Sequence, residues 1–125
     1  MANFFTKVLD RMFSTSPEPR ERVIRIEPDG VALFKVHSQA LVLRFKWADV
    51  VRIHTFKRDL FSFDEICLQF DLANGSCVTL GEEDADWTPL MQAVQEHFAL
   101  PADWWGTVMK PAFVENYRLL WEKPR

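Results

Sequence analysis

The chain has 125 residues and a formal net charge of −3 at pH 7, and 48% of its residues are hydrophobic and 14% aromatic. This composition supports one domain, residues 1–125, with a packed core, and it argues against a disordered chain. The slight acidic excess gives no electrostatic footprint for nucleic acid as a partner. No apolar run approaches the length of about 20 residues that a transmembrane segment needs.

The residues near the N-terminus and the two cysteines favour a cytoplasmic location. Lys7, Asp10 and Arg11 interrupt the apolar residues there, so the apolar centre of a signal peptide is missing. Without an export signal, the cysteines are expected to remain reduced. We therefore expect Cys67 and Cys77 to be ordinary, unbonded residues.

The first predicted element is an amphipathic helix over residues 3–13. Its apolar residues recur at helical spacing. They are Phe4, Phe5, Val8, Leu9, Met12 and Phe13. The polar segment 14–22 contains two prolines and is expected to connect this helix to the next element.

Residues 22–82 predict an antiparallel meander of about six strands. Apolar and polar residues alternate in residues 23–27 and 41–46, as expected of half-buried strands. Between them, Pro28-Asp29-Gly30 is expected to form a tight turn in which Gly30 is free to take a positive φ. Further strands are predicted over residues 50–57, 63–72 and 77–82. The short connections favour antiparallel neighbours over crossovers.

The pairing of the last two strands can be predicted to the residue. A two-residue turn at Asn74-Gly75 would split the apolar face, because a slip of one residue moves every side chain to the other face. We therefore predict a three-residue loop with Gly75 in a left-handed conformation. The predicted pairs are Phe70 with Leu80 and Leu72 with Val78. In that register Cys67 and Cys77 lie too far apart to form a disulfide.

A helix is predicted to follow the last strand and to lie across the sheet. Trp87, Leu90, Met91, Val94 and Phe98 form a single apolar stripe at helical spacing. Pro89 is acceptable in a first turn, where backbone N–H groups have no partner within the helix. The acidic run before the helix, residues 82–86, is interpreted as N-terminal capping, with the side chain of Asp84 or Asp86 as the cap.

Residues 99–125 predict a helical extension rich in aromatic residues. Asp103 is expected to cap a short helix from Trp104 to Lys110, which Pro111 ends. The spacing of the apolar residues after Pro111 suits a last helix, and an extended segment is the alternative. These residues are Phe113, Tyr117, Leu120 and Trp121.

The segments VIRIEPDGVALF and LRFKWADVVRI, with a helix after the last strand, resemble the bacterial pleckstrin-homology-like domains. The most specific part is the W-x-x-V-x-x-I run of Trp47, Val50 and Ile53, which in that superfamily marks the turn from the third strand into the fourth. The resemblance covers about residues 22–98. It implies an α+β fold whose antiparallel sheet, of six to seven strands, forms a partly open barrel. It also implies a scaffold that binds lipids, peptides or proteins, and no single function.

Several kinds of site are not supported by the residue pattern. The loop Glu27-Pro28-Asp29-Gly30 is acidic, and although Arg25 and Lys35 could flank it, its carboxylates argue against a phosphoinositide ligand. The three histidines have no neighbouring ligand at the spacing of a metal site. No nucleophile–base pattern or glycine-rich phosphate loop is present, so we expect a protein without catalytic activity or cofactor.

The aromatic C-terminal extension is the predicted binding site. On a helix, the adjacent Trp104 and Trp105 point about 100° apart. At least one of them is therefore expected to be exposed in the monomer and covered by a partner, and the alternative is that both are buried in the fold. The complete predicted set is Trp104, Trp105, Phe113 and Trp121.

The sequence thus predicts a non-enzymatic binding module that acts through protein contacts. An adaptor or an immunity-type protein would fit the small size and acidic charge, with a protein partner or a second copy as the ligand. The alternative is a binder of lipid or of a small apolar ligand in an aromatic-lined pocket.

Overall fold

The computed structural model describes residues 21–59, 64–101, 103–105 and 117–124. The helix predicted over residues 3–13 lies outside these residues, as does Phe113. Of the short helix predicted from Trp104 to Lys110, the described part is Trp104 and Trp105, which are helical.

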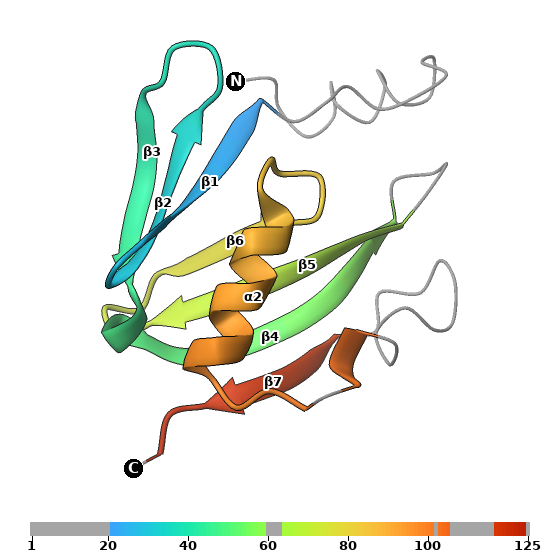
Figure 1. Ribbon diagram of the computed structural model, residues 1–125. Coiled ribbons are helices and arrows are strands. Elements are labelled where there is room, and N and C mark those ends of the chain that lie inside the picture. Colours follow the sequence, from blue (N-terminus) through green and yellow to red (C-terminus); the bar gives the residue numbers. More distant parts are fainter. Residues whose placement is uncertain (1–20, 60–63, 102, 106–116, 125) are drawn as a thin grey trace.

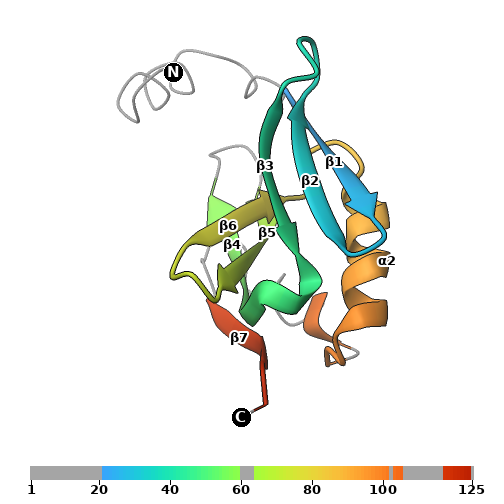
Figure 2. The same ribbon diagram turned by 90° about the vertical axis from the view of Figure 1, so that its left-hand side faces the viewer.

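In the described parts of the chain, seven strands form two antiparallel sheets (Figures 1 and 2). The three-stranded sheet has the order β1-β2-β3 and contains β1 (Arg22–Glu27), β2 (Gly30–Lys35) and β3 (Leu41–Lys46). The four-stranded sheet has the order β6-β5-β4-β7 and contains β4 (Val50–Asp59), β5 (Asp64–Leu72), β6 (Cys77–Gly81) and β7 (Arg118–Glu122). The six strands predicted up to residue 82 are thereby confirmed, and they follow one another as antiparallel neighbours within each sheet.

The two sheets are open, so the predicted partly open barrel is wrong in this respect. The short 3-10 helix η1 (Trp47–Asp49) separates β3 from β4, and these strands do not pair. At this point the Trp47 N–H donates to the Asp29 carbonyl of the β1–β2 turn, at 2.9 Å. The chain therefore changes direction at η1 and starts a second sheet.

The helix α2 (Trp87–His97) lies in the angle between the two sheets (Figures 1 and 2). Its buried residues join core residues of both sheets in a single hydrophobic cluster. Trp87, Leu90, Ala93 and Val94 are the buried residues of the helix. The predicted stripe across the sheet is confirmed, and Pro89 lies in the first turn as expected.

The predicted cap of α2 is right in its position, Asp86, and wrong in its hydrogen bond. Asp86 occupies the N-cap position with a left-handed φ of 66°, and its side chain makes no capping hydrogen bond. Asp84 is buried and binds elsewhere, because its carboxylate accepts hydrogen bonds from the Arg22 guanidinium and the Gly81 N–H. The acidic run thus holds strands together more than it caps the helix.

The β1–β2 turn is as tight as predicted, since Glu27 pairs with Gly30. Gly30 does not take a positive φ, however. A Cβ atom at this position would overlap the Phe45 carbonyl and lie 2.8 Å from the Lys46 Cα. Glycine is therefore required here because β3 approaches closely.

The register of β5 and β6 differs from the predicted one by two residues. The observed pairs are Leu68 with Leu80 and Phe70 with Val78. The loop has the predicted three residues, 73–75, because the Leu72 N–H donates to the Ser76 carbonyl, and Gly75 has the predicted positive φ, 90°. The predicted pair of Leu72 with Val78 would instead have left five residues, 73–77, in the loop. Because a shift of two residues keeps every side chain on its face, the apolar face is still whole. Cys67 and Cys77 are unbonded, as predicted.

The last predicted helix is wrong for residues 118–122, where the alternative, an extended segment, is observed as β7. This strand pairs with β4, and the register shifts by one residue between the pairs Ile53–Trp121 and His54–Leu119. Leu120 and Trp121 consequently both pack against the core. A β-bulge of this kind interrupts the period of two and leaves a spacing that resembles a helix.

Among the described residues, no helix has the length and apolarity that crossing a membrane requires.

Trp47 is the residue on which we expect the junction between the sheets to depend. It is 7% exposed and packs edge-to-face on Phe45 and Phe98. Trp47→Ala should therefore lower the free energy of unfolding by about 3–5 kcal/mol in a urea titration. The half-buried Trp105, changed to alanine, should cost less. A loss below about 1 kcal/mol for Trp47→Ala would show that the junction does not need this side chain.

Candidate functional site

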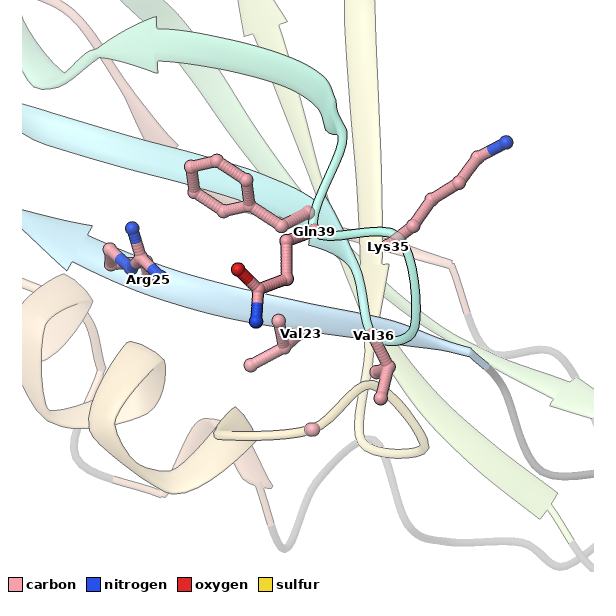
Figure 3. Close-up of a pocket in the computed structure, with 7 residues that line it drawn as sticks. Val23, Arg25, Lys35, Val36 and Gln39 are labelled. Carbon is pink, nitrogen blue, oxygen red and sulfur yellow. The ribbon is translucent and has the colours of Figure 1, made fainter.

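The outer face of the three-stranded sheet carries an open groove of about 310 Å³, which we call the hairpin groove. It lies where β1 and the end of β2 meet the β2–β3 turn and Ala85, which stands two residues before α2 (Figure 3). Its lining residues are Val23, Arg25, Phe34, Lys35, Val36, Gln39 and Ala85.

The β1–β2 register explains the floor of the groove. Val23 pairs with Phe34, and the neighbouring Ile24–Leu33 pair is buried in the core. Since successive side chains of a strand point to opposite faces, Val23 and Phe34 face outward. The wall is Ala85, whose N–H donates to the Arg22 carbonyl and whose carbonyl accepts from the Ile24 N–H, each at 3.0 Å.

The groove has a cation and no acid. The Arg25 guanidinium lies 4.4 Å from the centre of the Phe34 ring, a cation–π distance. Arg25 makes no ion pair with the described residues, whereas four other arginines each pair with a carboxylate. These are Arg22, Arg44, Arg52 and Arg58. None of the lining residues is acidic, and Arg25 is exposed.

Lys35 contributes less charge to the groove than Arg25 does. Figure 3 shows its side chain extending away from Arg25 and Gln39. Sequence reasoning placed Arg25 and Lys35 beside the acidic β1–β2 turn, but Lys35 pairs with Arg22 at the other end of the hairpin. Sequence reasoning therefore missed the groove. The one local sign of it was an aromatic residue next to a cation, Phe34 and Lys35, at the end of a predicted strand.

Exposed apolar side chains lie on the same hairpin as the groove. Val36, Leu41 and Val42 are 43%, 49% and 43% exposed. The other large apolar side chains with comparable exposure in the described parts of the chain are Tyr117 and Leu119, at β7. The three-stranded sheet thus combines apolar surface around the β2–β3 turn with Arg25 of β1, which makes no ion pair with the described residues.

The aromatic residues predicted to bind a partner lie elsewhere. Trp104 is buried in the core and meets the half-buried Trp105 edge-to-face, with ring centres 5.7 Å apart. Trp121 is half-buried against Phe98, at 4.6 Å. These three side chains do not line the hairpin groove, and their role in binding remains a prediction, as does that of Phe113.

A second polar cluster lies on the outer face of the four-stranded sheet. Asp71 accepts hydrogen bonds from Gln69 at 2.9 Å and Arg52 at 3.2 Å, and His54 lies 3.4 Å away. Burial raises the pKa of Asp71, but these donors and His54 outweigh it and lower the pKa overall. The Tyr117 ring stacks on His54, and burial raises the pKa of its hydroxyl. In this cluster the carboxylate of Asp71 is compensated by Arg52 and lies beside His54. We therefore assign the cluster a structural role, which is to hold β7 on β4.

The described residues contain no group of three or more His, Cys, Asp or Glu side chains arranged to hold a metal ion.

The chain matches no protein-family model, no curated protein and no solved structure. The resemblance to pleckstrin-homology-like domains therefore remains a prediction.

Glu82 belongs to the acidic run near the groove wall, and its charge is predicted to make the stability of the fold depend on pH. Burial raises the pKa of Glu82, as do Glu83 and Glu65, although the Ile66 N–H bond at 3.0 Å opposes this. A carboxyl whose pKa is raised by folding destabilises the fold as pH rises above its ordinary value of 4.5. Glu82→Gln, which keeps the acceptor for Ile66, should therefore be more stable than wild type at pH 8.

The measurement is urea denaturation of both proteins at several pH values. The advantage of Glu82→Gln should shrink as pH falls toward 4.5, because wild-type Glu82 then becomes protonated. Asp71→Asn is the matched control of opposite sign, since the lowered pKa of Asp71 means that its charge stabilises the fold at neutral pH. A Glu82→Gln variant that is less stable than wild type at pH 8 would contradict this account.

Proposed function

We propose that the protein is a non-enzymatic binding module, of adaptor type, whose hairpin groove binds an acidic segment of a protein partner. The observation that carries this proposal is Arg25, which lies over Phe34, makes no ion pair with the described residues and stands in a groove that has no acidic lining residue. A carboxylate can take two parallel hydrogen bonds from one guanidinium. The groove therefore favours Asp or Glu in its ligand.

The surroundings of Arg25 favour a peptide with apolar residues beside the acid. Val23 and Phe34 form an apolar floor, and Val36, Leu41 and Val42 extend apolar surface beyond the groove. Exposed apolar surface next to a charged anchor is typical of a protein interface. A small inorganic anion would leave this surface in water, so a protein segment fits better.

This proposal keeps the predicted class of function and moves the site. The predicted alternative was a ligand pocket lined by the C-terminal aromatic residues, but Trp104 is packed in the core. The predicted objection to a phosphoinositide, the acidic β1–β2 turn, lies at the other end of the hairpin from Lys35. A lipid headgroup is therefore included as an outcome of the test below.

The test is selection of random short peptides displayed on phage against the immobilised protein. Wild type should enrich sequences in which Asp or Glu stands beside large apolar residues. For the most enriched peptide, made synthetically, Arg25→Glu should weaken binding by about tenfold or more, because a hydrogen bond to a charged group contributes about 1.5–3 kcal/mol. Lys46→Glu is the matched control, since it makes the same change of charge at an exposed residue outside the groove lining.

Three outcomes would contradict the proposal. The first is that no peptide, or no acidic peptide, is enriched on wild type. The second is that Lys46→Glu weakens binding as much as Arg25→Glu does. The third is that the protein binds phosphatidylserine vesicles through Arg25 while no peptide competes, which would assign the groove to a lipid headgroup.

A further inference from the structure

Gln39 has a backbone conformation that is rare for its residue type. Its φ is 59°, in the left-handed region, where glycine, asparagine and aspartate are the usual residues. Its N–H donates to the Lys35 carbonyl at 3.0 Å, closing the turn between β2 and β3. A glycine would make the same turn without strain, so the turn alone does not explain a glutamine.

The side chain of Gln39 lies in the hairpin groove. Figure 3 shows it reaching from the turn over Val23, on the side of the groove where Arg25 lies. Its amide makes no hydrogen bond with the described residues, and it is exposed. The groove thus offers two kinds of polar group, a guanidinium that only donates and an amide that both donates and accepts.

From this arrangement we infer that Gln39 determines specificity, because its amide binds the main chain of the peptide whose carboxylate Arg25 binds. A peptide unit has one N–H and one C=O, and a glutamine amide complements both. A free carboxylate or phosphate has only acceptors and would not use the acceptor of Gln39. The inference rests on the proposed function and narrows its ligand to an extended segment with an accessible main chain. Strained residues are often retained where they serve a site, which is consistent with this role.

The test uses the synthetic peptide selected on wild type. Gln39→Gly keeps the left-handed turn and removes the amide, so the melting temperature should be unchanged or higher. Binding of the peptide should nevertheless weaken about five- to tenfold, the range for one or two neutral hydrogen bonds. If Gln39 serves only the turn, Gln39→Gly should bind the peptide with the affinity of wild type.

Salt dependence separates the two groove residues. Arg25→Met should weaken binding and reduce its dependence on salt concentration, because a charge pair is lost. Gln39→Gly should weaken binding with the salt dependence of wild type. Gln39→Asn, which tolerates the left-handed conformation and retains an amide, should bind with intermediate affinity.

Two failures can be distinguished. If wild type selects acidic peptides and Gln39→Gly binds them as tightly as wild type, the inference about Gln39 is overturned while the proposed function stands. If no acidic peptide is selected on wild type, both are overturned.

Discussion

The pairing of Arg22 in β1 with Asp84, which lies between β6 and α2, joins the first sheet to the segment that leaves the second, and the position of the groove wall depends on it. The Nε and Nη2 atoms of the Arg22 guanidinium donate to the two carboxylate oxygens of Asp84, each at 2.8 Å, and the Gly81 N–H donates to the same carboxylate at 2.9 Å. The Asp84 side chain is 0% exposed, so this charge has a large desolvation cost that its partners must offset. Removing either member should therefore loosen β1 from the connection between β6 and α2.

The hairpin groove is a consequence of this connection. Ala85 follows Asp84 directly, and its N–H and carbonyl both form hydrogen bonds with β1. These bonds add a parallel bridge at the edge of the three-stranded sheet, and Ala85 forms the groove wall. The same segment leads into α2, whose apolar residues fill the angle between the sheets. A ligand in the groove would thus contact the site where β1, the second sheet and the helix meet.

Local patterns in the sequence predicted most of the fold and little of the candidate site. Alternating residues and one apolar stripe were sufficient for six strands and α2, because those signals lie within single elements. The bulge at Leu120 gives the apolar residues of β7 a spacing like that of a helix, so this strand was predicted as a helix. The register of β5 with β6 is set by the length of the loop between them, and the pattern of apolar residues fits two registers equally well. The groove combines Arg25, Gln39 and Ala85 from three separate segments, and no local pattern indicates that contact. Trp104 could not be assigned to core or surface, since that depends on packing between elements.

A double-mutant cycle on Arg22 and Asp84 tests this account most directly. The free energy of unfolding would be measured for wild type, Arg22→Ala, Asp84→Ala and the double variant. We predict a coupling energy of about 1–3 kcal/mol, as found for residues that share a hydrogen-bonded ion pair, with the double variant less destabilised than the sum of the single variants. Additivity of the two single changes within about 0.5 kcal/mol would contradict the claim that this pair holds β1 to the segment between β6 and α2.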